Sequence, residues 1–384
     1  MPHIAGLRGV LPVAAKVAET LAAPVELAKA LAAGTLARDP SKSVYRYHTT
    51  FQGPGRLLNR KSFVCAVRLA PWADGMIRPH ETVSDQARAA ALAEIRANGA
   101  HTRFVFAGVR DTAGEVDRLF RRTEGLPPTL QTTTPDGAQH TLWRVQDAEV
   151  IGKLRNYFTP KKLHVLDGHD TYEAMLAYQA ELTAKQDPTM YSAANYGLFC
   201  IVPLDDQALV AAARHKVIRG VTKTSDEILA AAKQYFIVEK LAGAAGDVGK
   251  LLASVGESVA HQPAFIVVFA GEPDAWKLTL SPEVSPVHEG VTVHRAMAKH
   301  EPVVLDGLFI NRLLPGAQVT TDTDAKRALD AGGQITVIVR AMSIAEIAHV
   351  DDLGQTLPPH STAIFPPLAN GLVSNVIDPN EELV

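Results

Sequence analysis

Cysteine is scarce in this sequence. The 384 residues include two cysteines, Cys65 and Cys200, and each lies in an apolar run typical of a buried strand. Two isolated cysteines exclude a disulfide framework and a cysteine-rich metal site. We therefore expect inert thiols in the core and, from the reducing environment that this usage fits, a cytoplasmic protein.

The chain also lacks an excess of charge of one sign. Its formal net charge is -3, so no overall positive field is present to attract nucleic acid. The pairs Arg121-Arg122 and Lys161-Lys162 are short, and no aromatic residues alternate with them as they do in a nucleic-acid groove. We expect no nucleic-acid partner.

No apolar run is long enough to span a membrane. The most apolar stretch, residues 9–33, is interrupted at helical intervals by charged side chains such as Lys16, Glu19 and Glu26. This spacing predicts neither a signal peptide nor a membrane span, and we expect no membrane partner. It predicts an alanine-rich pair of helices broken near Pro24, within a helical N-terminal segment of residues 1–42.

The standard motifs of nucleotide binding and hydrolysis are absent. The sequence contains no GxGxxG, GxxxxGK[ST], GxSxG or HExxH. No reaction can therefore be assigned from these patterns, and the candidates must come from less specific features.

The composition is that of a folded protein with a large core. Hydrophobic residues make up 47% of the chain and charged residues 21%. A chain of this length exceeds one ordinary core, so we predict two intimately packed units, residues 43–205 and 206–384, after the N-terminal segment. The oligomeric state is left open.

Strand-like and helix-like stretches alternate irregularly, with hairpins between them. This pattern favours an α+β or mixed-sheet α/β fold over a regular doubly wound one. The clearest elements are paired strands at 43–51 and 61–69, a helix at 84–97 between Ser84 and Gly99, a hairpin of 130–133 with 139–143, and a strand at 163–166 followed by a helix.

The turn Asp167-Gly168-His169 is the best candidate site. A strand that gives way to a helix directs backbone N–H groups at a bound anion, Gly168 allows a close approach, and His169 exchanges protons near neutral pH. Two other interpretations remain open. Asp170 to Glu173 has the spacing of a capping box. A weaker interpretation is a metal site with nitrogen and oxygen ligands from His164, Asp167, His169 and Asp170. Because it is the weaker one, we assign no metal residues.

Three further groups are candidates. His80 and Glu81 follow a proline in a loop, where functional residues are common. His215 and Arg219 are spaced to present two cations to a phosphate, although a solvated face explains them better. A rigid loop near the C-terminus offers ligand-binding polar groups on His360, Ser361 and Thr362.

Taken in order, these stretches resemble the microbial family called domain of unknown function 1015, over residues 43–377. Its signature DGHHRYETA resembles Asp167–Ala174, and its KPHE resembles Arg78–Glu81. Its THRLVRG is similar to Arg214–Gly220, and its MPPKST to Leu357–Thr362. The DGH element is also similar to one in the sulfiredoxin and ParB-like fold, which includes nucleotide-dependent serine kinases.

The resemblance implies phosphoryl transfer or phosphate-ester chemistry on a small phosphorylated or hydroxylated compound, such as serine, with a nucleotide or a divalent metal as cofactor. It implies catalytic roles for Asp167, His169, His80 and Glu81. The family's His-Arg pair after DGH is replaced here by Asp170-Thr171, which puts an acid where an anion would bind. The alternative is therefore a non-catalytic member of the family that binds a ligand or a partner protein.

Overall fold

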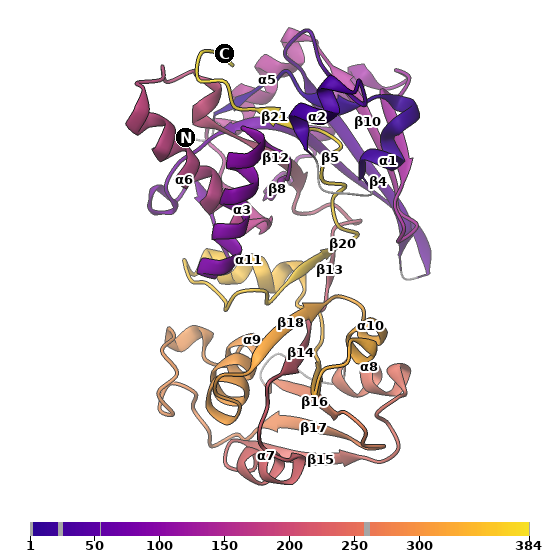
Figure 1. Cartoon of the computed structure of the whole chain (residues 1–384), viewed down its shortest axis with the longest axis vertical. Coiled ribbons are helices and arrows are strands. Elements are labelled where there is room, and N and C mark those ends of the chain that lie inside the picture. Colours follow the sequence, from indigo (N-terminus) through magenta and orange to yellow (C-terminus); the bar gives the residue numbers. More distant parts are fainter. Residues whose placement is uncertain (1–2, 22–25, 54, 257–261, 384) are drawn as a thin grey trace. The chain divides into compact units, whose positions relative to one another are not determined.

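The computed structural model describes residues 3–21, 26–53, 55–256 and 262–383. The chain forms two compact units, drawn in Figure 1: unit 1 contains Met1–Val210 and Ile364–Val384, and unit 2 contains Ala211–Ala363. The short strands β13 (Val210–Ala212) and β20 (Ala363–Phe365) carry the chain across the two division points.

The division differs from the predicted one at the C-terminal end. Residues 364–384 belong to unit 1, although the sequence analysis assigned them to the second unit. The reason is that these last residues pair with strands of unit 1 that lie far away in the sequence. The strand β21 (Asn375–Val376) pairs with β7 (Ala100–His101), and Ser374 forms a bridge with Val10. Such long-range pairing leaves no local signal in the sequence.

The N-terminal segment is only partly helical. It contains α1 (Val17–Leu21) and α2 (Leu27–Ala32), but β1 (Ile4–Ala5) joins the main sheet of unit 1, and β2 (Val10–Pro12) pairs with β3 (Leu36–Arg38). The prediction of a separate helical segment is therefore wrong, because the alanine-rich composition masked short buried strands. The predicted break near Pro24 lies outside the described residues.

Unit 1 is built on a mixed sheet. The strand order is β6-β11-β8-β12-β5-β4-β10-β9, and β1 pairs with the C-terminal end of β5. The pairs β6/β11 and β8/β12 are parallel and the others antiparallel, which confirms the predicted mixed fold. The strands are β4 (Val44–Gly53), β5 (Arg56–Arg68), β6 (Ile77–Arg78), β8 (Val105–Val109), β9 (Leu130–Thr133), β10 (Gln139–Val145), β11 (Leu163–Asp167) and β12 (Tyr196–Pro203).

The two cysteines lie in the centre of this sheet, as predicted. Cys65 on β5 and Cys200 on β12 are fully buried. Burial raises the pKa of the Cys65 thiol, and it raises that of Cys200 to about 12. Both thiols therefore stay protonated and unreactive at neutral pH.

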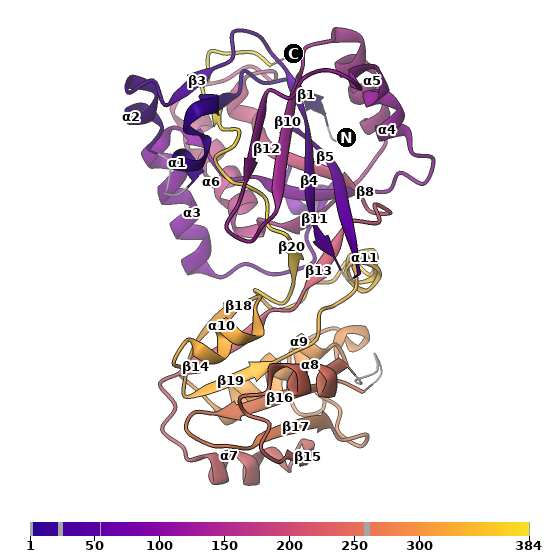
Figure 2. The same ribbon diagram turned by 90° about the vertical axis from the view of Figure 1, so that its right-hand side faces the viewer.

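In the described part of unit 1, four α-helices follow α1 and α2. They are α3 (Asp85–Asn98), α4 (Glu115–Phe120), α5 (Ala148–Phe158) and α6 (His169–Lys185), and Figure 2 shows α3 on one side of the central strands and α4 and α5 on the other. Ser84 accepts a hydrogen bond from the N–H of Ala87, and Gly99 ends α3 in the left-handed conformation. No helix in the described residues is both long and apolar enough to cross a membrane.

Unit 2 has its own sheet and core. The strand order is β15-β17-β16-β19-β14-β18, and all of these pairs are antiparallel. Phe236, Phe265 and Phe309 meet in the core, with Phe309 on a π-helix, η6 (Leu305–Leu313). The other elements are β14 (His215–Arg219), β15 (Phe236–Leu241), β16 (Ala264–Phe269), β17 (Ala275–Leu280), β18 (Gln318–Asp322), β19 (Ile335–Ile338), α7 (Ser225–Ala232), α8 (Val248–Gly256), α9 (Glu301–Val304), α10 (Ala325–Asp330) and α11 (Ile344–Asp352).

Candidate functional site

The two motifs that contain His80 and His169 meet in unit 1 because the strands before them are neighbours. β6 pairs in parallel with β11, with Ile77 opposite Leu163. Parallel strands end at the same edge of a sheet, so the residues that follow them emerge side by side. This is also the edge at which open α/β sheets bind ligands.

His80 and His169 form the centre of the candidate site, and both side chains are buried. Their imidazole rings meet edge to face with centres 4.7 Å apart. The backbone N–H of His80 donates to Nε2 of His169 at 3.4 Å, so a neutral His169 carries its proton on Nδ1. The two motifs are therefore in direct contact, as a shared site requires.

Glu81 completes the cluster. Nδ1 of His80 donates to the carbonyl oxygen of Val165 at 2.7 Å, because a carbonyl can only accept. Nε2 of the same ring lies 3.5 Å from Oε1 of Glu81. These two facing atoms are both acceptors unless one of them holds a proton. The two atoms can therefore form a hydrogen bond with each other only through a proton that one of them carries.

Gly168 is required by the fold of the turn. Its φ of +83° lies in the left-handed region, and a Cβ atom there would be 2.8 Å from the carbonyl oxygen of Phe104. Its N–H donates to Oδ1 of Asp167 at 2.8 Å. The close approach predicted for a ligand is made here by the main chain of Phe104, so a ligand contact at Gly168 stays a prediction.

The capping-box interpretation of Asp170 is wrong. α6 begins at His169, and its N-cap is Gly168, which has no side chain to accept a hydrogen bond. Asp170 lies in the first turn, where its Oδ2 is 3.4 Å from Nη1 of Arg103. Thr171, where the family pattern has arginine, is buried, so an arginine would have to displace packed neighbours.

Two helices begin near the cluster, and their N-terminal ends favour an anion. α6 starts at His169 itself, and α3 starts at Asp85, four positions after Glu81. The partial positive charge at the start of each helix attracts negative groups. Asp170 opposes this attraction, although Arg103 offsets part of its charge.

The predicted cation pair of His215 and Arg219 is wrong. Both residues lie on β14 in unit 2, where four positions of extended chain separate them by roughly 13 Å. Burial lowers the pKa of His215 to about 4, so its ring is neutral at pH 7 and accepts from the N–H of Val339. Arg219 instead donates to the hydroxyl of Thr320 and to the carbonyl of Ala331.

The loop with His360, Ser361 and Thr362 is held by cations of unit 2. Nζ of Lys216 donates to the carbonyl of His360 at 3.1 Å, and Nε of Arg214 donates to that of Thr362 at 2.6 Å. The hydroxyl of Ser361 donates to the carbonyl of Pro358 at 2.6 Å. These bonds hold His360 at a φ of +55°, and the ligand role of the loop stays a prediction.

The metal interpretation finds no support. Among the described residues, no three histidine, cysteine or carboxylate side chains are grouped so that they could hold a metal ion. The set of His164, Asp167, His169 and Asp170 is therefore no metal centre of the protein alone. Asp167 could still contribute one carboxylate to an ion whose other ligands come from a bound phosphate.

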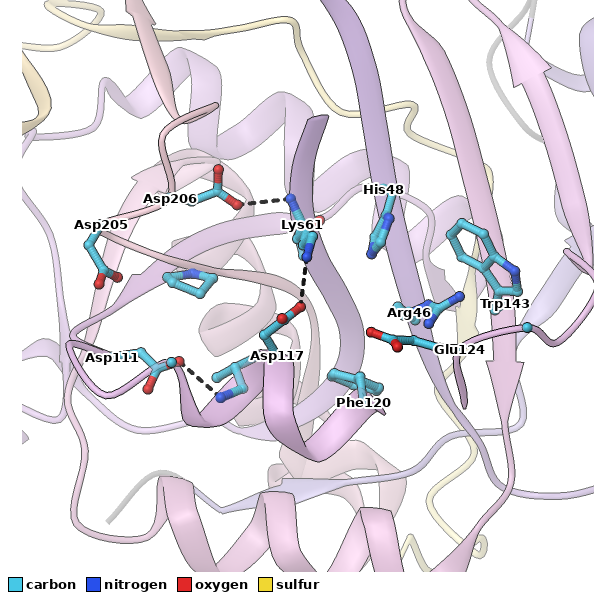
Figure 3. A pocket seen from close by; sticks show the side chains of 15 residues that line it. Arg46, His48, Lys61, Asp111, Asp117, Phe120, Glu124, Trp143, Asp205 and Asp206 are labelled. Carbon is cyan, nitrogen blue, oxygen red and sulfur yellow. Dashed lines mark hydrogen bonds and ion pairs between the residues drawn. The ribbon is translucent and has the colours of Figure 1, made fainter. Parts of the chain in front are cut away.

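A cavity in unit 1 was missed by the sequence analysis. It has a volume of about 370 Å³ and lies between α4 and the strands β4, β5 and β10 (Figure 3). Asp111 lines it just beyond β8, whereas Phe104, which touches Gly168, lies just before that strand. Seven positions of extended chain place the cavity on the order of 20 Å from the turn. The cavity is a separate site.

Its lining explains why it was missed. The side chains come from positions between 46 and 206 on four strands, a helix and their loops. Arg46, Lys61, Asp117 and Trp143 follow no common spacing, and each occurs in a stretch that an ordinary strand or helix explains. The sequence carries no local signal that would have found this site.

The fold and the histidine cluster define a mixed-sheet α+β protein with a candidate site at the sheet edge. The chain belongs to the family described as "Protein of unknown function (DUF1015)", which it matches over residues 13–306. This confirms the resemblance, although the match starts before Ser43 and ends before the loop at Leu357. The similarity of the turn to the sulfiredoxin and ParB-like fold stays a prediction. No curated protein matches the chain.

Several solved structures are similar to the chain at low identity. A free serine kinase variant in complex with AMP is 10% identical with a TM-score of 0.39, covering 77% of this chain and 86% of that one. A conserved hypothetical protein from Pyrococcus furiosus has the same identity and score, with 77% and 89% covered. SbnI from Staphylococcus aureus is 11% identical with a TM-score of 0.37, with 80% and 85% covered. Scores this low carry no argument about function.

Proposed function

We propose that this protein transfers a phosphoryl group to or from a small hydroxylated compound, or cleaves a phosphate ester of one, at the cluster of His80, Glu81 and His169. The observation that carries the proposal is the contact between the two motifs, with ring centres 4.7 Å apart at the start of α6. Proton donors and acceptors lie there beside a helix end that favours an anion.

Each residue has a role in this proposal. His169 exchanges a proton with the reacting oxygen, and the pair of His80 and Glu81 supplies or stores that proton. The first turn of α6 receives the phosphate, as helix starts do in many nucleotide sites. Asp167 orients His169 or gives one carboxylate to a divalent ion that accompanies the phosphates.

Asp170 favours a second candidate function, in which the site binds its ligand without catalysis. Its carboxylate lies in the turn that would receive the anion and is only partly balanced by Arg103. A phosphate therefore meets a negative charge that the family pattern does not have. In this alternative the protein holds a neutral or hydroxylated compound, or a partner protein.

The first experiment measures turnover and binding together. Serine and phosphoserine are tested with ATP, ADP or AMP and Mg²⁺, which are the substrate and cofactor classes implied by the resemblance of the Asp167-Gly168-His169 turn. Phosphorus NMR follows turnover, and a thermal shift follows binding. We expect E81Q and H169A to lower the turnover of the wild type by at least about a hundredfold. H288A, which changes an exposed histidine of unit 2, is the control.

The outcomes separate the two functions. Turnover that survives unchanged in both E81Q and H169A would remove the cluster from the chemistry. Binding without turnover, strengthened for a phosphate ligand by D170N, favours the non-catalytic alternative. The substitution D170N is preferred to the family's His-Arg pair because Thr171 is buried.

A further inference from the structure

The cavity beside α4 has apolar walls that come from three separate elements. Val116 and Phe120 lie on α4, Trp143 lies on β10, and Pro203 ends β12. Figure 3 shows Phe120 and Trp143 among the side chains that line the cavity. Its volume of about 370 Å³ is within the range of sites that bind small organic molecules. Walls of this kind suit an apolar ring.

His48 presents accessible polar atoms to this cavity. Its ring lies edge to face with that of Trp143, with 4.9 Å between the ring centres. Neither ring nitrogen forms a hydrogen bond with a residue that the structure describes, and neither is sealed in the interior. Nε of Arg46, by contrast, is fully enclosed and can meet no ligand. A molecule in the cavity can therefore form a hydrogen bond with His48.

The protonation state of His48 limits what it can recognise. Burial, and then the positive charges of Arg46 and Lys61, lower its pKa to about 4, so the ring is uncharged at neutral pH. One ring nitrogen then donates a hydrogen bond and the other accepts one. An amide group carries both a donor and an acceptor, so it can pair with either nitrogen. An uncharged amide also avoids the cost of moving a charge out of water.

The charges of the lining disfavour an anion. Five carboxylates and two cations line the cavity. One of the cations, Lys61, forms an ion pair with Asp117, with 3.0 Å between Nζ and Oδ1. The other, Arg46, donates to the hydroxyl of Thr123 at 3.1 Å and lies over the ring of Trp143. The net negative charge therefore repels a carboxylate or a phosphate.

We propose that this cavity binds a small uncharged aromatic amide. The ring packs against the apolar walls formed by Val116, Phe120 and Pro203, and the amide forms a hydrogen bond with a ring nitrogen of His48. The proposal does not rest on the function proposed for the histidine cluster, because the two sites share no residue. It also assigns the cavity to a different class of molecule from the phosphorylated compounds expected at that cluster.

Benzamide is the probe, and benzoate is its matched comparison, because the two molecules have nearly the same shape and differ in charge. Isothermal titration calorimetry on the full chain measures the affinity of each. We expect benzamide to bind saturably at one site, at least about tenfold more tightly than benzoate. The proposal is overturned if benzamide shows no saturable binding, or if benzoate binds as tightly as benzamide.

The variant H48F tests the contact with His48, because phenylalanine keeps an aromatic ring beside Trp143 but removes both nitrogens. Fluorobenzene, which has the ring without the amide, is the second probe, and fluorine NMR follows its binding. H48F should weaken benzamide about fivefold and leave fluorobenzene unchanged. The control H288F, at an exposed histidine of unit 2, should change neither affinity. The role of His48 is overturned by an equal loss for both probes, or by an H48F that binds benzamide as H288F does. Absence of fluorobenzene binding overturns the role of the apolar walls.

Discussion

A Cβ atom at Gly168 would lie 2.8 Å from the carbonyl oxygen of Phe104, closer than any real Cβ contact. The turn from β11 into α6 thus packs closely against the main chain of Phe104, the residue before β8. Because Gly168 also has a φ of +83°, both its conformation and its surroundings exclude a side chain. The candidate site stands on a turn that only glycine can form.

We therefore expect G168A to destabilise the protein by about 3 kcal/mol, from the left-handed conformation and the clash together. G114A is the matched control. Gly114 has a φ of +65° but no atom within 4 Å of the added Cβ, so only the conformational cost of about 1 kcal/mol applies. Urea unfolding measures the loss in free energy of unfolding for both variants. Equal losses for the two variants would show that the contact with Phe104 has no effect.

Elements set by local chemistry could be predicted from the sequence. The serine before α3 and the glycine after it fixed the ends of that helix within one residue. The hairpin of β9 and β10 formed around Gly137, whose φ of +82° is the left-handed conformation that this turn requires. In these cases the deciding contacts lie within a few positions along the chain.

The candidate site could be predicted only in part. The motifs with His80 and His169 were recognised separately, but their contact depends on the pairing of β6 with β11, about 85 positions apart. The start of α6 was misjudged because Gly168, and not Asp170, is the N-cap. For His215, a spacing of four residues was read as helical, but the segment is a strand.

Asp39 ties the N-terminal segment to the sheet of unit 1. It is buried, and its Oδ2 accepts from the hydroxyl of Tyr45 at 2.6 Å and from Nε of Arg144 at 2.8 Å. The hydroxyl of Tyr45 in turn accepts from the N–H of Gly9 at 3.0 Å. One carboxylate therefore connects β4, β10 and the first residues of the chain.

We expect D39A to destabilise the protein by about 3 kcal/mol, because it leaves the charge of Arg144 and the hydroxyl of Tyr45 without their partner. Y45F should cost less, about 2 kcal/mol, because it leaves the N–H of Gly9 without its acceptor but keeps the ion pair between Asp39 and Arg144. The free energies of unfolding of D39A and Y45F, each compared with that of the wild type, test this difference. A loss in D39A no greater than in Y45F would mean that the ion pair contributes nothing.

Unit 2 contains a buried acid whose ionisation opposes folding. Burial raises the pKa of Glu301 to about 8, although the guanidinium of Arg340, with Nε 3.5 Å from Oε2, acts in the other direction. The folded state therefore favours the protonated side chain. Its contribution to stability is present below the ordinary pKa of 4.5 and is lost as the pH rises toward 8.

The variant E301Q removes this dependence, because glutamine stays neutral. We expect its free energy of unfolding to be close to that of the wild type at pH 5 and higher by about 2 kcal/mol at pH 9. E346Q is the control with the opposite sign. Burial acts to raise the pKa of Glu346, but hydrogen bonds from Arg340 and Ser343 lower it to about 2, so its contribution is present above pH 4.5 and E346Q should lose about 1 kcal/mol at both pH values. If E301Q gains no more at pH 9 than at pH 5, then Arg340 and not burial controls the ionisation of Glu301.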